Sequence, residues 1–154
     1  NQKIVIEQEL FELDEQIREV VLSLEKEWTN KNIELDIDLD EVSIRTDKTL
    51  LSHVWSNIIG NAIKYSYDNS KIEIKLRNEN DKIKVTIKDY GIGIEEEKIP
   101  YIFNKFYQGD TSHSNEGNGL GLALVKGIVD LINGKIEVHS EVNKGTEFIV
   151  TLNK

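Results

Sequence analysis

Three side chains able to bind a metal-nucleotide complex recur at helical spacing in the middle of the chain. Asn57, Asn61 and Lys64 project within an arc of roughly 60° beside the apolar face of their segment, and Tyr65 borders them. An amide oxygen is a neutral, hard ligand that suits Mg²⁺ carrying nucleotide phosphates, and lysine suits those phosphates as a point charge. A solvated polar stripe has the same pattern, so the spacing alone leaves both interpretations open.

A carboxylate and two glycines, Asp89-Tyr90-Gly91-Ile92-Gly93, follow an alternating apolar segment. A carboxylate at the end of a strand accepts a hydrogen bond from the exocyclic amine of adenine but repels the carbonyl that guanine carries there. The two glycines let backbone approach a flat ring without an intervening Cβ. The segment therefore indicates an adenine site, and a plain Asp-Gly turn is the alternative.

A glycine-rich segment, Gly117-Asn118-Gly119-Leu120-Gly121-Leu122, runs directly into a helical pattern. Bare backbone N–H groups and the positive end of a helix suit an anion, so the segment predicts a phosphate contact. Its spacing fits neither G-x-G-x-x-G nor G-x-x-x-x-G-K-S/T, which excludes a Rossmann or Walker A interpretation. A flexible hinge before the helix is the alternative.

The three histidines, His53, His113 and His139, do not form a recognisable metal or hydrolase set. His53 lies one helical turn before Asn57, but a histidine on a helix surface is more often structural than catalytic.

Composition bounds the class of protein. The chain has 154 residues, 19 Lys plus Arg and 28 Asp plus Glu, which predicts one globular domain and argues against nucleic acid as a partner. The absence of Cys excludes disulfides and thiolate chemistry. Because the chain lacks Met and opens with Asn1, we expect it to be a fragment of a longer protein.

Hydrophobic periodicity predicts the elements that position these side chains. Helical spacing covers residues 14–30, 48–65 and 120–132, whereas alternation predicts strands at 33–39, 42–46, 72–76, 83–89, 136–138 and 148–152. Residues 90–118 are expected to form a long mobile loop, tied down only by the apolar residues 99–107.

The order of the motifs resembles a known family. The segments in question are Asn57-x-x-x-Asn61-Ala62-x-Lys64-Tyr65, Asp89-x-Gly91-x-Gly93, Phe103-x-x-Phe106, Gly117-x-Gly119-Leu120-Gly121-Leu122 and Gly145-Thr146-x-Phe148. They resemble the N, G1, F, G2 and G3 boxes of the ATP-binding domain of sensor histidine kinases, in the GHKL superfamily. The resemblance runs from about Phe11 to Leu152.

The resemblance implies a Bergerat-type fold, which is a two-layer α/β (α+β) sandwich with helices packed on one face of a mixed β-sheet. It also implies a mobile ATP lid at about Gln108 to Gly117, expected to gain order when nucleotide binds. Residues 1–10 would be a linker from a preceding segment, and residues 11–154 the ATP-binding domain.

Roles for individual residues follow from the same resemblance, with ATP and Mg²⁺ as cofactors. Asn61 would hold Mg²⁺ with Asn57 beside it, Lys64 would meet phosphate, Tyr65 would lie against adenine, and Asp89 would accept from its amine. The residues expected to bind cofactor are Asn57, Asn61, Lys64, Tyr65, Asp89, Gly91, Gly93, Phe106, Gly117, Gly119, Leu120, Gly121 and Thr146. Those expected to be catalytic are Asn57, Lys64 and Lys105.

Two departures bear on the chemistry. Lys105 stands where the family often has Arg, and Gln108 stands where it often has a basic residue, so the clamp on the γ-phosphate is expected to be weaker or supplied differently. The related gyrase-type ATPases place a Glu at the position of Asn57, and Asn cannot act as a general base. Transfer to a protein acceptor is therefore favoured over hydrolysis.

The resulting hypothesis is a histidine kinase catalytic domain that serves two-component signalling. Its partners would be a phosphoacceptor His segment of the same protein and a response regulator, with the isolated fragment a monomer. The resemblance implies a cytoplasmic domain, with a membrane-anchored sensor as one form of the parent protein. A nucleotide-binding switch without kinase activity and an anti-sigma-type Ser kinase are the alternatives.

Overall fold

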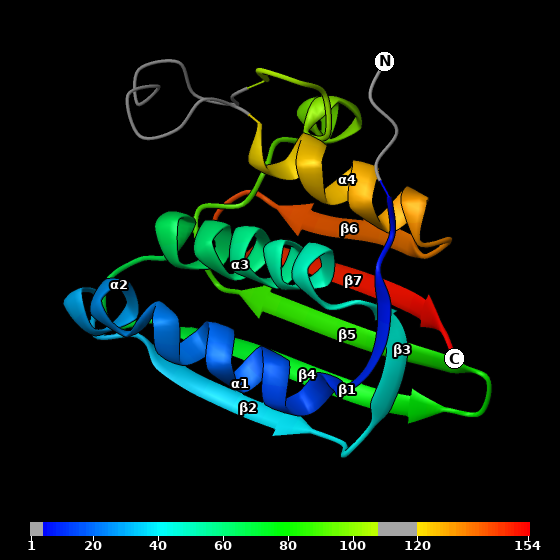
Figure 1. The fold of residues 1–154 in the computed structure, drawn as a ribbon. Coiled ribbons are helices and arrows are strands. Elements are labelled where there is room, and N and C mark those ends of the chain that lie inside the picture. The colour runs from blue at the N-terminus through cyan, green and yellow to red at the C-terminus, as the bar shows by residue number, and fades with distance from the viewer. Residues whose placement is uncertain (1–4, 108–119) are drawn as a thin grey trace.

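A layer of helices covers one face of a β-sheet in the computed structural model, which describes residues 5–107 and 120–154 (Figure 1). The elements in chain order are β1 (Gln8–Glu12), α1 (Leu13–Ser23), α2 (Glu25–Asn30), β2 (Glu34–Leu39), β3 (Ser43–Asp47), α3 (Lys48–Tyr65), β4 (Lys71–Glu79), β5 (Lys82–Asp89), the 3₁₀ helix η1 (Glu96–Tyr101), α4 (Gly121–Leu131), β6 (Lys135–Glu141) and β7 (Gly145–Asn153).

The main sheet of the described residues has the strand order β2-β4-β5-β7-β6. Strand β2 runs parallel to β4, and every other neighbouring pair is antiparallel, so the sheet is mixed. Helices α1, α3 and α4 lie side by side on one face (Figure 1). This confirms the expected two-layer sandwich, while the expected lid at 108–117 lies outside the described residues.

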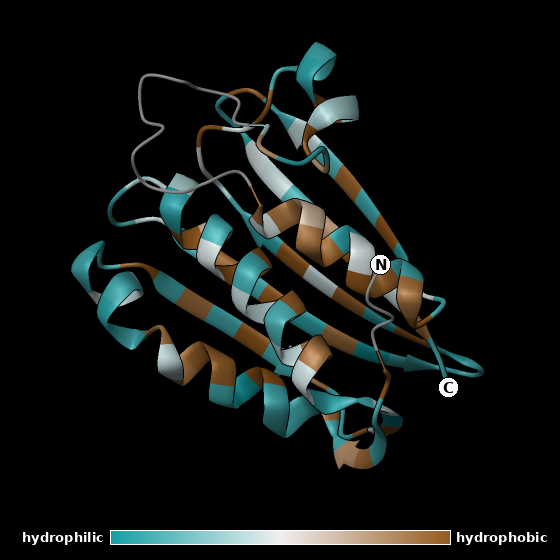
Figure 2. Cartoon of the chain, turned by 45° about the horizontal axis from the view of Figure 1, so that its top comes forward, coloured by the Kyte–Doolittle hydropathy of each residue, from teal (hydrophilic) through white to brown (hydrophobic). Residues whose placement is uncertain are grey.

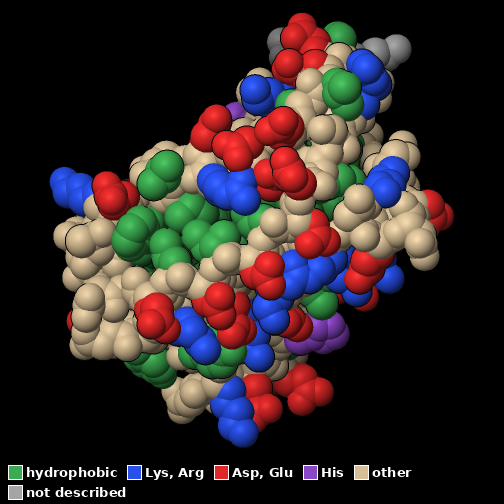
Figure 3. All heavy atoms as spheres, turned by 90° about the horizontal axis from the view of Figure 1, so that it is seen from below, with side chains coloured by type: hydrophobic (Ala, Val, Ile, Leu, Met, Phe, Trp, Pro, Cys, Tyr) green, Lys and Arg blue, Asp and Glu red, His purple; other side chains and the backbone are tan. Residues whose placement is uncertain are grey.

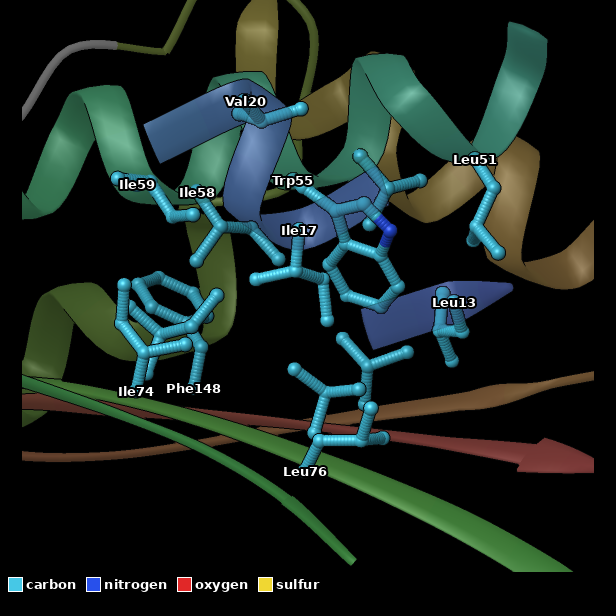
Figure 4. Close-up of a cluster of buried hydrophobic side chains, with 14 of the residues drawn as sticks. Leu13, Ile17, Val20, Leu51, Trp55, Ile58, Ile59, Ile74, Leu76 and Phe148 are labelled. Atoms are coloured by element: carbon cyan, nitrogen blue, oxygen red, sulfur yellow. The ribbon is translucent and has the colours of Figure 1, made fainter. Parts of the chain in front are cut away.

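The core lies between these two layers. Inward side chains of the central strands alternate with outward polar ones, and Figure 2 shows the matching apolar stripes on the helices. Trp55 of α3 is fully buried among Ile17, Leu76 and their neighbours (Figure 4). Its indole N–H donates to Gln16 Oε1 at 2.9 Å, so the largest core side chain also has its polar atom paired.

Helix α3 carries the predicted metal-nucleotide residues, and its start is fixed by Asp47. One oxygen of Asp47 accepts from the Leu50 N–H at 3.0 Å, and the other accepts from the Glu7 N–H at 2.9 Å. These backbone hydrogen bonds lower the pKa of the Asp47 carboxyl from its ordinary value. Asp47 therefore joins the helix to the chain that leads into β1.

The helix predicted over 14–30 is interrupted, and that prediction was wrong in this respect. Helix α1 ends at Ser23 and α2 begins at Glu25, with Leu24 between them in a non-helical conformation. The Trp28 indole N–H donates to the Val21 carbonyl at 2.9 Å, a carbonyl near the end of α1. The Trp28 side chain thus adds a second donor to the Val21 carbonyl, which also accepts from the Leu24 N–H at 3.1 Å.

Strand β1 was missed from the sequence. It pairs antiparallel with β3 in a two-stranded sheet beside the main one, with Gln8 opposite Asp47 and Glu12 opposite Ser43. The strand takes in part of the segment 1–10 that was expected to be a linker. The boundary proposed at residue 11 stays a prediction.

The outer surface is highly charged. Seen from below in Figure 3, acidic and basic side chains lie close together around a patch of hydrophobic side chains. None of the helices formed by the described residues is both long and apolar enough to cross a membrane.

Candidate functional site

Three element ends meet on the left of Figure 1: the last turn of α3, the end of β5 and the start of β7. The first turn of α4 lies against the middle of α3. Asp89 and Thr146 face each other across the β5–β7 pair. A Cβ placed on Gly121, at the start of α4, would lie 2.8 Å from Asn57 Oδ1 on α3. The fold thus brings together residues of the first, second, fourth and fifth of the predicted motifs.

Asp89 is the buried carboxyl of the site, with 4% of its surface exposed. Its Oδ1 accepts from the Gly91 N–H at 2.9 Å and from the Thr146 N–H at 3.3 Å. Burial raises the pKa of Asp89 to about 6, although the two N–H groups act to lower it. The carboxyl is therefore largely ionised at neutral pH, although its burial disfavours the charged form.

The two oxygens of Asp89 are not equivalent. Both hydrogen bonds found among the described residues reach Oδ1, and none reaches Oδ2. No fully buried side-chain polar atom in the described part lacks a partner, so Oδ2 is accessible rather than sealed in the core. Oδ2 is available to accept a hydrogen bond from a ligand.

Gly91 and Gly93 have backbone neighbours that fill the space of a side chain. A Cβ on Gly91 would lie 2.0 Å from the Tyr65 carbonyl oxygen, and one on Gly93 would lie 2.1 Å from that of Glu141. Gly93 also has a φ of 73°. The absence of side chains at Gly91 and Gly93 therefore lets the loop after β5 pack against α3 and the β6–β7 turn. The sequence alone did not reveal this structural role of the two glycines.

A hydroxyl pair supports Thr146. Its Oγ1 lies 2.7 Å from Ser140 Oγ, which also accepts from the Ile94 N–H at 2.8 Å. Ser140 thereby joins β6 to the loop that follows Asp89. Sequence reasoning missed Ser140, although the hairpin register that pairs it with Thr146 was the signal that could have found it.

The two asparagines of the polar stripe on α3 differ in their hydrogen bonding. Asn57 donates from Nδ2 to the His53 carbonyl at 2.8 Å and presents Oδ1 toward Gly121. Asn61 is half-buried, and its side chain makes no hydrogen bond within the described part of the chain. Asn61 thus offers an uncommitted amide one turn closer to the Asp89 end of the site.

Lys64 and Tyr65 pack together at the last turn of α3. The Lys64 ammonium lies 5.2 Å from the centre of the Tyr65 ring, and 41% of Tyr65 is exposed. The Tyr65 carbonyl accepts from the Ile92 N–H at 3.1 Å. The turn is thereby joined to the loop that carries Gly91.

The segment after η1 has two aromatic residues packed against the core, Phe103 and Tyr107, and one exposed aromatic residue, Phe106. Phe103 packs edge-on against Phe148 with ring centres 6.4 Å apart, whereas Phe106 is 71% exposed at a φ of 64°. Lys105 is exposed beside it. Contacts of Lys105 and Phe106 with nucleotide stay a prediction.

The glycine-rich motif is described only from Leu120 onward. Leu120 caps α4 and accepts from the Leu124 N–H at 2.9 Å. Gln108, Gly117 and Gly119 lie outside the described residues, as does His113.

The side chains present fit Mg²⁺ with a nucleotide. Mg²⁺ prefers oxygen ligands and retains several waters when it binds with phosphates, so the amide oxygen of Asn61 would suit it as a protein ligand. The accessible oxygen of Asp89 suits an amine, and the ammonium of Lys64 suits phosphate. The Asp89 carboxylate is held in place by the backbone N–H groups of Gly91 and Thr146.

Two other features of the described part lie away from these residues. One is a cavity of about 120 Å³ near the end of α4, lined by Ile44, Leu131, Leu152 and others. The other is a group of carboxylates from Glu12, Asp14 and Glu15 at the start of α1. Asp14 is already paired with Arg18 and with the Val42 N–H, so this group is structural.

Comparison with known proteins gives consistent matches. The sequence profile of the histidine kinase-, DNA gyrase B-, and HSP90-like ATPases matches residues 46–154. The signal transduction histidine-protein kinase ArlS of Staphylococcus aureus is 35% identical over 144 residues. That alignment covers 92% of this chain and 32% of ArlS, so the chain spans about a third of this curated relative.

Solved structures agree in fold. The nucleotide-free catalytic domain of histidine kinase ThkA is 32% identical, with a TM-score of 0.85 and 96% of each chain covered. Histidine kinase ThkA in complex with the response regulator protein TrrA matches with a TM-score of 0.82 at 29% identity, covering 97% of this chain and 42% of that one.

Proposed function

Because the chain belongs to the family of histidine kinase-, DNA gyrase B-, and HSP90-like ATPases, we propose that it is the ATP-binding catalytic domain of a sensor histidine kinase. In this role it donates the γ-phosphoryl group of Mg·ATP to a His on a separate dimerisation segment of the parent protein. The parent then serves a two-component system. The similarity to the ThkA catalytic domain over nearly its whole length supports this proposal.

The observation that carries the proposal is the asymmetry of Asp89. Oδ1 is held by two backbone N–H groups, so Oδ2 has a fixed direction and remains an acceptor. The exocyclic amine of adenine donates to such an oxygen, whereas the carbonyl at that position of guanine meets a second acceptor. Asp89 thereby selects ATP over GTP.

Asn61, Asn57 and Lys64 occupy the α3 stripe next to this acceptor. Asn61 holds Mg²⁺ through its amide oxygen, and Lys64 binds the phosphates. When bound, Mg²⁺ neutralises charge on the β- and γ-phosphates during transfer. Aligning the phosphoryl group with its acceptor is the main contribution of the protein, since this reaction needs little covalent help.

Asn57 favours transfer over hydrolysis. Its amide N–H already donates to the His53 carbonyl, and an amide has no basic group with which to activate water. The nucleophile must then arrive on a partner segment. A response regulator that takes the phosphoryl group from that His, and a cytoplasmic location with access to ATP, complete the proposal.

Calorimetry with Mg·ATP and Mg·GTP tests the binding half. We expect ATP to bind, GTP to bind at least about tenfold more weakly, and Asn61→Ala to reduce the Mg²⁺ dependence of ATP affinity. Asn78→Ala, which changes an exposed Asn on β4, is the matched control. Equal affinity for GTP would contradict the role of Asp89.

The chemistry is tested on a chain extended to include the acceptor segment. Acid-labile phosphate on His supports the histidine kinase. Acid-stable phosphate on a partner Ser would indicate the anti-sigma-type kinase, and nucleotide binding with no transfer would indicate a switch module.

A further inference from the structure

The carbonyl end of α3 is held by a lysine from another part of the chain. The last carbonyls of a helix have no partner within it and need donors from elsewhere. Lys31, from the turn between α2 and β2, donates from Nζ to the carbonyls of Ile63 at 2.9 Å, Lys64 at 2.7 Å and Ser66 at 3.0 Å. All three ammonium hydrogens are therefore used on one helical turn.

The remaining carbonyl of this turn belongs to Tyr65 and points the other way. It accepts from the Ile92 N–H at 3.1 Å, in the loop that follows Asp89. Lys31 and Ile92 thus hold the turn from two sides. The turn carries Lys64 and Tyr65, the two residues proposed to contact phosphate and adenine.

A second contact strengthens the same connection. Asn32 donates from Nδ2 to Asn69 Oδ1 at 2.7 Å, and the Asn69 N–H donates to the Lys31 carbonyl at 2.8 Å. Both asparagines have positive φ, 52° for Asn32 and 64° for Asn69. We call this set of contacts between residues 31–32 and residues 63–69 the α3 clasp.

A lysine suits the clasp for two physical reasons. Its positive charge lies at the negative end of an 18-residue helix, where cations are stabilising. Hydrogen bonds from a charged donor are also stronger than neutral ones. A neutral side chain of the same length provides neither effect.

We propose that Lys31 is a positioning residue for the nucleotide site. It acts through the last turn of α3, which it fixes so that Lys64 and Tyr65 keep their positions beside the loop that follows Asp89. This inference rests on the proposed function, because the residues that it positions are those proposed to bind ATP. Loss of the ammonium leaves the Lys64 and Ser66 carbonyls to water and the Ile63 carbonyl with only the Ser66 N–H at 3.2 Å. The turn then frays, which misaligns both side chains.

The test compares Lys31→Met, Lys31→Arg and Lys26→Met. Met keeps the length of the side chain without its charge, Arg restores a cationic donor, and Lys26 is an exposed lysine on α2 that serves as the control. Each variant is measured well below its own melting temperature, so that the folded protein is compared. The readouts are ATP affinity by calorimetry and amide hydrogen exchange.

We expect Lys31→Met to weaken ATP affinity by about tenfold, since hydrogen bonds from charged groups are strong and a misplaced contact is costly. Lys31→Arg restores most of the affinity, and Lys26→Met leaves it unchanged. An unchanged ATP affinity in folded Lys31→Met would overturn the proposal, as would Lys31→Arg binding no better than Lys31→Met.

Hydrogen exchange separates this inference from the proposed function. The Ile92 and Asn69 amides, bonded to Tyr65 and Lys31, exchange faster in Lys31→Met than in Lys26→Met if the clasp holds the turn. This readout needs no nucleotide. If wild-type protein binds no ATP, the proposed function fails while faster exchange still supports the clasp; unchanged exchange at both amides overturns the clasp itself.

Discussion

Replacing Asp89 with Asn should stabilise the nucleotide-free domain while weakening its binding to ATP. The pKa of Asp89 is about 6 in the folded protein, against an ordinary value of 3.8, because burial disfavours the charged form. A difference of about 2 pH units corresponds to about 3 kcal/mol of free energy at neutral pH. Asn removes this charge and keeps an oxygen for the Gly91 and Thr146 N–H groups.

The pH dependence has a definite sign. Since the folded pKa is raised, the folded state binds more protons than the unfolded state between about pH 4 and pH 6. The stability contributed by protonated Asp89 is present below about pH 4 and is lost as the pH rises through 6. The advantage of Asp89→Asn is therefore full at pH 7.5 and small at pH 4.

The same substitution should change nucleotide selectivity. The amide oxygen of Asn takes the place of Oδ1, which leaves the NH₂ group in the place of Oδ2. The NH₂ group of Asn would then face the amine of adenine, and two donors cannot form a hydrogen bond with each other. The same NH₂ group can donate to the carbonyl of guanine. ATP affinity should fall by at least about tenfold, and the preference for ATP over GTP should shrink.

Urea denaturation of both proteins at pH 7.5 and pH 4 measures the stability difference, with exposed Asp68→Asn as the control. Calorimetry with ATP and GTP measures the selectivity. The reasoning is refuted if Asp89→Asn is no more stable than wild type at pH 7.5, or if its advantage is the same at both pH values.

Three further predictions follow from particular contacts. Gly91→Ala should lower the free energy of unfolding by about 3 kcal/mol or more, because its Cβ would lie 2.0 Å from the Tyr65 carbonyl oxygen. Gly60→Ala, at a position with open space around it, should instead stabilise α3 by about 0.5 to 1 kcal/mol. Urea denaturation measures both changes, and equal effects of the two substitutions would contradict this prediction. Asn61→Ala should abolish phosphoryl transfer in a chain that includes the acceptor segment, as radiolabelled ATP would reveal; normal transfer would exclude Asn61 as the Mg²⁺ ligand. The 154-residue chain alone should not label itself and should hydrolyse ATP only slowly, whereas stoichiometric label would place an acceptor within it, with His53 the first suspect.

Periodicity predicted most of the architecture because it is a local signal. Helix α3 and the β4–β5 hairpin were found close to their observed bounds, since one face of each is buried and the pattern repeats along it. Strand β1 escaped because only a partner far along the chain, β3, makes it a strand. The break at Leu24 escaped because the apolar spacing continues across it, and the hydrogen bond from the Trp28 indole to the Val21 carbonyl is not visible in that spacing.

The candidate site likewise contains residues that the sequence predicted and residues that it did not. The carboxylate of Asp89 and the stripe on α3 were recognisable from residue type and spacing, although their roles stay predictions. The residues that support the site were not recognisable. Lys31 donates to the Lys64 carbonyl, 33 residues further along the chain, and Ser140 accepts from the Ile94 N–H, 46 residues earlier. Such contacts depend on tertiary packing, which no local pattern reports.

The most direct test of the central claim is the chemical nature of the transferred phosphate. A chain extended to include the proposed acceptor segment is incubated with Mg²⁺ and ATP labelled at the γ-position, and the labelled residue is identified. The proposed function predicts acid-labile, alkali-stable phosphate on a His of that segment, dependent on Asn61 and followed by transfer to a response regulator. Label that is stable to acid, or no label in a chain shown to bind ATP, would contradict it.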